Sequence, residues 1–277
     1  MMVPPRHFRS RPCRPRLTTL GIFLVIVASR AADGSDAAPP DRAPSTIRET
    51  QITLTTGQAQ FQATVIAKED RTLTILTSGH SLAPADVGQA VGISRGGERL
   101  RGRVVAVARN PFFQPVKARD RDDHSVRNIV GVDNAIATLV AAPTGADEER
   151  ILRKIRPADM APRAMPSGPR RIVSVHIVDR LGEEHVVRAG NHLNPKCLAW
   201  GQRSYAVKPG DSGAGVFILL KTAPGTTRPV LIGNVSLDDE RGGIAPLVFR
   251  QDRWVEEALA SRKSSEDEPG DRSTTVP

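Results

Sequence analysis

One serine, Ser212, stands in a setting that suits a nucleophile. It lies between an acid and a glycine in the stretch KPGDSGAGVF, residues 208–217, where a proline–glycine turn runs directly into apolar strand residues. Glycine-rich turns usually mark only a tight bend, but such a turn can also hold an exposed hydroxyl beside a buried strand. A serine hydroxyl is a poor nucleophile until a neighbouring base removes its proton. The chain must therefore supply a base and an acid.

The best candidate for the base is His80, which ends the apolar run LTILTSGH, residues 73–80. A strand anchored in a core holds its terminal side chain with little positional freedom, as a base requires. The polar surroundings of His185 and His192 predict solvated side chains, and His176 is typical of a strand residue with a local partner. A single histidine at a strand end is more often structural than catalytic, so His80 needs independent support.

A third group must orient the imidazole and offset its positive charge. Asp133 suits this role because it stands at the head of the apolar run VDNAIATLV, residues 132–140. Most other acids, including Asp120, Asp122 and Asp123, lie in charged loops, where a carboxylate is ordinarily solvated. Asp133 is therefore the candidate acid.

With their neighbours, the three residues form motifs in a fixed order. The motifs are Thr77-Ser-Gly-His80, Asp133-x-Ala135-x-x-x-Leu139 and Gly210-Asp-Ser212-Gly. They resemble the histidine, aspartate and serine motifs of the chymotrypsin-like (trypsin-fold) serine peptidases, and the resemblance extends over about residues 50–260. Ser81 follows the histidine where many family members carry a disulfide cysteine. This departure indicates the disulfide-poor, bacterial-type branch.

The resemblance implies a secreted serine endopeptidase that cleaves polypeptides through an acyl-enzyme. Ser212 would attack the carbonyl, His80 would take and return the proton, and Asp133 would hold the imidazole tautomer. The backbone N–H groups of Gly210 and Ser212 would form the oxyanion hole, because Gly210 lacks a Cβ and can adopt the geometry needed. No metal and no organic cofactor are implied.

Asp211, the acid beside the nucleophile, is implied by the resemblance to turn inward and pair with a cation. Activation by a newly cut N-terminus is not expected, because the sequence RRIV, residues 170–173, follows Asp133 and a cut there would separate the two halves of the fold. An internal cation is expected instead. The candidates are Arg170, Arg171 and Arg203.

Alignment through the serine motif also predicts where the side chain before the cut bond would bind. The base of that pocket falls at Ala206, which supplies no charge, and Val207, Ser236 and Gly243 would contribute walls. An apolar pocket selects weakly among apolar side chains, so we expect a preference for small or medium apolar residues. Asp238 is the alternative: near the pocket mouth it would attract a basic side chain, whereas in a solvated loop it would not.

The elements that must position these residues are short. The runs contain four to eight residues, are rich in Val, Ile and Thr, and are bounded by Gly, Pro, Asn or Asp, as in antiparallel sandwiches and barrels. A helix is predicted at 250–259, with Trp254, Val255, Ala258 and Leu259 on one face. With the resemblance, the fold class is all-β: two antiparallel six-stranded β-barrels and a C-terminal helix. The predicted strands are 61–67, 73–77, 87–93, 103–108, 136–140, 172–178, 185–189, 216–220 and 230–235.

Composition along the chain predicts its domain organisation. The N-terminal barrel would occupy 48–140, and the C-terminal barrel with its helix 170–260. The connector between them, 141–169, is charged and proline-rich, with room for a short helical turn. Residues 32–47 are typical of a flexible spacer and 261–277 of a disordered tail.

Residues 1–31 have the order of a signal peptide: a basic run, an apolar stretch at 20–28 and small residues at 29–32. The apolar stretch is too short to span a membrane, so we expect export to the periplasm or the exterior, without stable membrane insertion. This segment holds six of the 39 Lys and Arg residues and no acid, which leaves 33 bases against 30 acids. Because the chain has a single Tyr, basic patches interleaved with aromatic residues are not expected, and neither is nucleic-acid binding.

Cysteine use is minimal after the signal peptide. Cys197 alone remains, so neither an internal disulfide nor a C-x-x-C metal motif is possible, and a packed thiol is expected.

The alternative to an enzyme is a catalytically silent trypsin-fold binding protein. The presence of all three catalytic residue types argues against that alternative. The sequence does not indicate the oligomeric state.

Overall fold

The computed structural model describes residues 46–57, 59–113, 132–162, 172–191, 196–223, 226–236, 238–239 and 242–266. All of them belong to one compact unit, residues 42–277. The predicted signal peptide, most of the predicted spacer and residues 267–277 of the predicted tail lie outside the described residues, as do Arg170, Arg171 and His192. In the part of the chain that is described, no helix is both long enough and apolar enough to cross a membrane.

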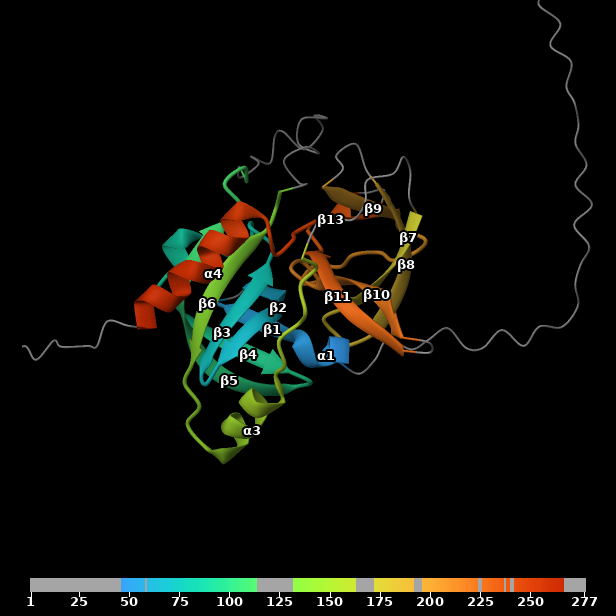
Figure 1. The fold of residues 1–277 in the computed structure, drawn as a ribbon. Coiled ribbons are helices and arrows are strands. Elements are labelled where there is room, and N and C mark those ends of the chain that lie inside the picture. The colour runs from blue at the N-terminus through green and yellow to red at the C-terminus, as the bar shows by residue number, and fades with distance from the viewer. Residues whose placement is uncertain are drawn as a thin grey trace, which may run out of the picture. The chain divides into compact units, whose positions relative to one another are not determined.

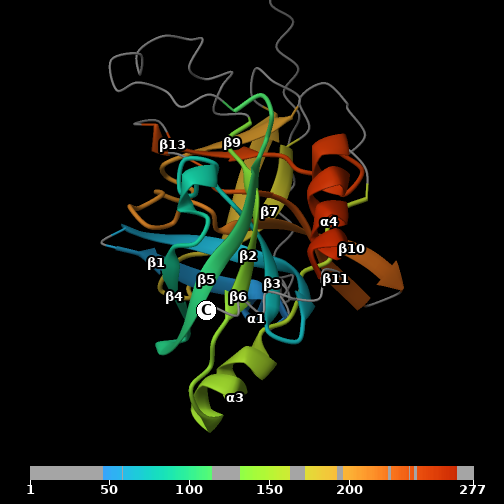
Figure 2. The same cartoon turned by 90° about the vertical axis from the view of Figure 1, so that its left-hand side faces the viewer.

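The N-terminal half forms a closed, antiparallel six-stranded barrel in the order β1-β2-β3-β6-β5-β4 (Figures 1 and 2). The barrel is filled by apolar side chains such as Leu54, Val65, Ile75 and Leu139, all fully buried. The first barrel is therefore confirmed. Its strands are β1 (Gln51–Thr56), β2 (Ala59–Glu69), β3 (Thr72–Thr77), β4 (Ala90–Arg95), β5 (Glu98–Arg109) and β6 (Ala135–Ala141).

Alternation of side chains explains why these segments form a barrel with one solvated face. In β5, Leu100 and Val104 point into the core, whereas Arg101 and Arg103 are exposed. Successive side chains of a strand point to opposite faces, so the sequence ERLRGRVV can bury one face and solvate the other. Gly102 also faces inward, where an added Cβ would lie 2.8 Å from Ile93 Cδ1.

The C-terminal half forms a seven-stranded sheet in the order β11-β10-β7-β8-β9-β13-β12. The prediction of a second closed six-stranded barrel is therefore not met. β11 meets the chain after β13 only at the bridge between Gly233 and Leu247 and through the Val248 N–H on the Ile232 carbonyl, at 2.9 Å. This contact is too short for a ladder. The strands are β7 (Ile172–Val178), β8 (Glu184–Asn191), β9 (Cys197–Gly201), β10 (Gly215–Ala223), β11 (Thr226–Asn234), β12 (Asp238–Asp239) and β13 (Gly242–Pro246).

Helical segments are short except at the C-terminus. α3 (Ala146–Lys154) confirms the helical turn expected in the connector, and its acidic first turn and basic last turn complement the helix dipole. α4 (Arg253–Glu266) confirms the predicted terminal helix and continues into the segment predicted as a tail. The remaining described helices are α1 (Thr46–Thr50) and the 3-10 helix η1 (Pro84–Asp86).

A separate apolar cluster joins the two sheets. It contains Leu76 at the end of β3, Ile136 at the start of β6, Phe217 of β10 and Val255 of α4. Each of these side chains is at most 2% exposed. Because the cluster packs the end of β3, the start of β6 and β10 together, it holds in place the turns that carry the candidate residues.

Candidate functional site

His80 and Asp133 form a doubly hydrogen-bonded pair. Thr77 pairs with Ala135 where β3 meets β6, so a residue just after β3 and one just before β6 lie side by side. The backbone N–H of His80 donates to Asp133 Oδ1 at 2.8 Å, and Nδ1 lies 2.6 Å from Oδ2. The carboxylate is buried, whereas the His80 side chain is 38% exposed. This geometry fixes the ring and leaves Nε2 as the nitrogen not used by Asp133.

Asp133 is also tied to the second sheet. Ser236, two residues after β11, donates its hydroxyl to Asp133 Oδ2 in a short hydrogen bond. Asn234 Nδ2 donates to the Asp133 carbonyl at 3.3 Å. The carboxylate therefore has three hydrogen-bond partners: a backbone amide, the imidazole and a hydroxyl. Ser236 was expected only as a pocket wall, so its contact with Asp133 was missed.

Ser212 lies in the turn before β10 and is half-buried. Its hydroxyl donates to the Ser236 carbonyl at 2.9 Å and makes no hydrogen bond to His80, although both residues are described. Ser236 thus contacts two of the three predicted catalytic residues, Asp133 through its hydroxyl and Ser212 through its carbonyl. The structure brings the three residues to one place, with the Ser212 hydroxyl turned toward Ser236.

The turn around Ser212 has two glycines with positive φ, Gly210 at 95° and Gly213 at 90°. A Cβ on Gly213 would lie 1.9 Å from the Gln62 carbonyl oxygen, so glycine is required there. The Gly213 N–H donates to the Val235 carbonyl at 2.7 Å, and the Ser212 carbonyl accepts from Gln62 N–H at 2.9 Å. Within the described part of the chain, neither the Gly210 amide nor the Ser212 amide has an acceptor. Two amides are left free beside the hydroxyl.

Asp211 is fully buried and turned inward, as expected, but its partners are neutral. Its carboxylate accepts the Tyr205 hydroxyl at 2.7 Å and the backbone N–H groups of Lys208 and Arg180 at 2.8 and 3.2 Å. Arg203 makes no ion pair with it in the described structure, and Arg170 and Arg171 are not described. Of the three candidate cations, Arg203 is therefore ruled out, and the other two lie outside the described residues. Tyr205 supplies its place because its hydroxyl reaches the acid from within the core.

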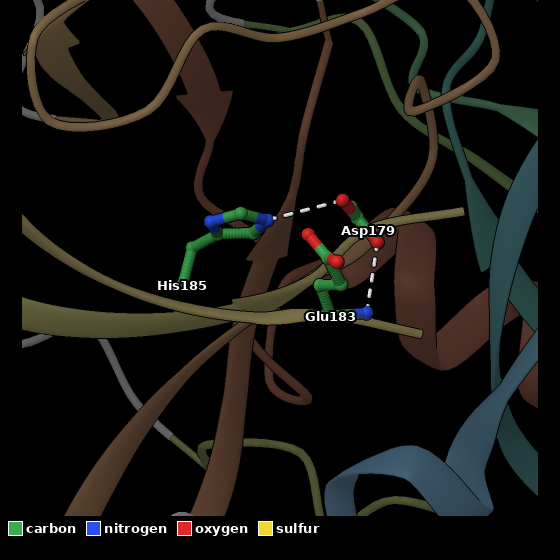
Figure 3. Close-up of side chains that lie close together, drawn as sticks. All are labelled: Asp179, Glu183 and His185. Atoms are coloured by element: carbon green, nitrogen blue, oxygen red, sulfur yellow. Dashed lines mark hydrogen bonds and ion pairs between the residues drawn. The ribbon is translucent and has the colours of Figure 1, made fainter. Parts of the chain in front are cut away.

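Tyr205 also contacts a second polar cluster, formed by Asp179, Glu183 and His185; Figure 3 shows this cluster. The His185 ring stacks on the Tyr205 ring with centroids 4.3 Å apart, and its Nε2 lies 3.1 Å from Asp179 Oδ2. His185 was predicted to be solvated; its side chain is 26% exposed, because one face of the ring packs on Tyr205. Burial, the hydrogen bond to Asp211 and the negative charges of Asp211 and Asp179 raise the pKa of Tyr205 well above its usual range.

The same hairpin also turns Asp179 inward. Asp179 Oδ1 accepts the backbone N–H groups of Leu181 and Glu183, each at 2.9 Å. Burial pushes the pKa of Asp179 upward, but the hydrogen bonds from His185, Glu183 and Leu181 outweigh burial and bring this pKa below its usual range. In the described chain, Asp179, Glu183 and His185 form the group with spacing for a metal ion, their ligand atoms lying within 4.8 Å of one another.

The predicted pocket residues have different surroundings. Ala206 is exposed, Val207 is buried, and Ser236 is buried against Asp133. β12 pairs with β13 so that the backbone of Asp238 lies opposite Gly243; the Asp238 side chain is not described. Trp200, which the sequence did not indicate, packs on Gly243, where an added Cβ would lie 2.2 Å from Trp200 Cζ2.

Trp200 fixes this corner by a hydrogen bond as well, because its Nε1 donates to the Tyr205 carbonyl at 3.1 Å. The space beside Gly243 is therefore filled by the indole. Cys197, the first residue of β9, is buried as predicted. Burial raises the pKa of its thiol to about 12, so it stays protonated near neutral pH.

No protein-family model and no curated protein matches the chain. Among solved structures, it is similar to the Rv3671c protease in an inactive form, with 15% identity, a TM-score of 0.43 and coverage of 78% of this chain and 90% of that one. It is also similar to a human pathogenic astrovirus serine protease, with 14% identity, a TM-score of 0.41 and coverage of 74% and 93%. Both relatives are proteases. At such low values the function must be inferred from the site itself.

Proposed function

We propose that the chain is an exported serine endopeptidase that cleaves peptide bonds through an acyl-enzyme on Ser212. The observation that carries this proposal is the His80–Asp133 pair, in which two hydrogen bonds of 2.8 and 2.6 Å fix the ring beside a serine turn with two free amides. A buried carboxylate on Nδ1 favours the tautomer whose Nε2 can accept a proton. A histidine kept for structure alone has no need of this arrangement.

The reaction begins when the Ser212 hydroxyl turns from the Ser236 carbonyl to His80 Nε2. As Oγ bonds to the substrate carbonyl carbon, its proton passes to Nε2, and Asp133 stabilises the resulting imidazolium. The carbonyl oxygen becomes an oxyanion facing the amides of Gly210 and Ser212, whose positions are fixed in advance. The imidazolium then protonates the departing amine, and water repeats the sequence to release the acid product.

The pocket supports cleavage after small apolar residues. The indole of Trp200 occupies the space beside Gly243, and the nearby Val207 is apolar. Export rests on the signal-like segment 1–31 and is tested by N-terminal sequencing of the protein recovered outside the producing cell, where a start at Ala32 or Asp33 is expected.

A second candidate function, a silent protein with the protease fold, is favoured by one observation. The Ser212 hydroxyl donates to Ser236 and not to His80. A protein that only binds peptides has no need for the Ser212 hydroxyl to be turned toward His80. The two functions differ in whether Ser212 reacts.

Labelling with a fluorophosphonate followed by peptide mapping distinguishes them, because this probe bonds only to an activated serine. We expect the label on Ser212, its loss in Ser212→Ala and His80→Ala, and its retention in the matched control Ser204→Ala, which removes an exposed hydroxyl from the same loop region. Hydrolysis of denatured casein should follow the same pattern. The two single variants and their double variant should lose similar activity, because the groups act as a unit. Equal rates of casein hydrolysis by the wild-type protein and Ser212→Ala would contradict the assignment of the chain as a serine peptidase.

A further inference from the structure

A long groove lies beside the serine turn, on the side away from the predicted pocket. Its volume is about 920 Å³, and it runs between the β7–β8 hairpin and the outer face of the first barrel. At one end it is lined by Gln60, Gln62 and Arg180. At the other end it reaches Arg48 of α1 and the turn between β4 and β5, strands that lie beside β1 in Figure 2.

The groove is lined by more positive than negative side chains. Arg48, Arg95, Arg99 and Arg180 all line it, and none of them forms an ion pair with another described residue.

The two acids that line the groove are already engaged. Glu98 lies 3.1 Å from Lys154, and the bond to Lys154, together with the nearby positive charges, lowers the pKa of Glu98 below its usual range. Asp179 is only 1% exposed and faces His185. Four arginines and Lys154 line the groove against these two carboxylates, so the groove keeps an excess of positive charge.

The groove begins at the reacting serine. Gln62 N–H donates to the Ser212 carbonyl at 2.9 Å. An added Cβ on Gly210 would lie 3.1 Å from Arg180 Cδ and 3.5 Å from the Gln60 carbonyl oxygen. The residues predicted to hold the side chain before the cut bond, Val207 and Gly243, line no part of this groove. A chain bound across Ser212 therefore enters the groove after the cut bond.

We propose that this groove binds the substrate segment that follows the cut bond and selects segments rich in Asp and Glu. The inference rests on the proposed function for its direction along the substrate. The arginines hold a carboxylate-bearing chain by charge-assisted hydrogen bonds. Acidic stretches in unfolded polypeptides are the substrate class.

The first test compares internally quenched peptides that share Ala-Ala-Leu before the expected cut and Ala after it. The next three residues are Asp-Glu-Asp, Gln-Ser-Gln or Lys-Arg-Lys. We expect kcat/KM to be about tenfold higher for the acidic than for the neutral peptide in 20 mM salt, as the sum of several exposed charge pairs. In 300 mM salt the ratio should fall to about twofold, because the charges are screened. Equal rates for the acidic and basic peptides overturn the proposal.

Variants locate the effect on the groove. Arg48→Gln/Arg99→Gln removes two exposed guanidinium groups and should bring the acidic-to-neutral ratio close to one. The matched control Arg101→Gln/Arg103→Gln removes the same charge from exposed positions of β5 that line no part of the groove, and it should keep the ratio. An equal fall in both double variants would show that net charge alone is responsible, and would overturn the proposal.

Binding to the uncleaving Ser212→Ala protein separates this inference from the proposed function. The fluorescein-labelled acidic peptide should bind with at least fivefold lower Kd than the neutral peptide, measured by fluorescence anisotropy, and adding Arg48→Gln/Arg99→Gln should remove the difference. If the wild-type protein cleaves no peptide but this binding pattern is found, the enzyme assignment is wrong, whereas the proposal that the groove binds acidic segments is upheld. If peptides are cleaved but Ser212→Ala binds the acidic and neutral peptides equally, the proposal about the groove is wrong, whereas the enzyme assignment is upheld.

Discussion

Tyr205→Phe removes one oxygen atom from the support of the serine turn. The Tyr205 hydroxyl donates to the fully buried Asp211 at 2.7 Å. Phenylalanine keeps the ring, and with it the stacking on His185 at 4.3 Å and on Trp200 at 6.4 Å. The substitution therefore tests the hydrogen bond with little change in packing.

The cost can be estimated from the partners that remain. A hydrogen bond to a charged group contributes about 1.5–3 kcal/mol. In this variant Asp211 still accepts hydrogen bonds from the backbone amides of Lys208 and Arg180, at 2.8 and 3.2 Å. The carboxylate therefore loses one of its three donors. We expect the free energy of unfolding to fall by about 2 kcal/mol near pH 8.

Catalysis should respond as well, because Asp211 lies between the two residues whose amides face the oxyanion. Loss of a whole oxyanion donor costs about 10²–10³ in kcat, and a loosened turn should cost less, about tenfold. KM should change little, since the interaction strengthens in the transition state. Urea unfolding followed by tryptophan fluorescence and steady-state kinetics measure the two effects. A change in unfolding free energy below about 0.5 kcal/mol would refute the reasoning, because buried bonds of this kind contribute more.

The pH dependence gives a second, independent measure. Tyr205 is the sole tyrosine, so absorbance at 295 nm reports its ionisation alone. Burial and the bond to Asp211 raise its pKa in the folded state, while in the unfolded chain it titrates near pH 10. Above that pH the unfolded chain loses a proton that the folded protein keeps, so the stabilisation is complete below pH 10 and falls as pH rises further. Phenolate absorbance at pH 10 in the folded protein would contradict this account.

Three further substitutions test the geometry around the site. Asp133→Asn should lower kcat on the order of ten-thousand-fold while the fold is kept, because the amide favours the wrong imidazole tautomer; a loss below tenfold in a peptide assay would exclude this role. Ser236→Ala removes a hydroxyl from Asp133 but keeps the carbonyl that accepts from Ser212, so thermal melting should show a loss of about 1.5–3 kcal/mol. Gly213→Ala places a Cβ 1.9 Å from the Gln62 oxygen at φ 90°; we expect it to be insoluble or to melt at least 10 °C lower, about 3 kcal/mol, and an unchanged Tm would show that the turn can adapt.

Strands whose sequences alternate, or form continuous apolar runs, were predictable, because side-chain burial on a sheet has a period of two. Each of the nine predicted strands overlaps an observed one. Four observed strands, β1, β9, β12 and β13, were missed. β1 reads QITLTT, in which only Ile52 and Leu54 are apolar, too few to stand out as an apolar run. β13 reads GGIAP and owes its pairing to β9 rather than to its own strand propensity.

The positions of His80, Asp133 and Ser212 were predictable because each lies at the end of an apolar run. The contacts between the two sheets were not. Ser236 meets Asp133 across 103 residues of sequence, and no local pattern specifies such a contact. The sequence pointed to a cation beside Asp211, whereas the Tyr205 hydroxyl, a neutral donor, is one of the observed partners of this acid. A buried acid can be satisfied by neutral donors as well as by charge.

The Ser212 hydroxyl is turned away from His80, and this orientation is compatible with catalysis if it costs little free energy to reverse. Its bond to the Ser236 carbonyl at 2.9 Å is a neutral hydrogen bond of about 0.5–1.5 kcal/mol net. If His80 Nε2 offered no compensation at all, that energy would keep the reactive orientation at roughly a tenth of the population, a rate cost of about tenfold. The loss of a triad member costs a thousand-fold more than that. The orientation of one hydroxyl therefore weighs little against the fixed His80–Asp133 pair, and a silent protein would more readily have lost that pair than kept two hydrogen bonds and a buried carboxylate aligned beside a serine.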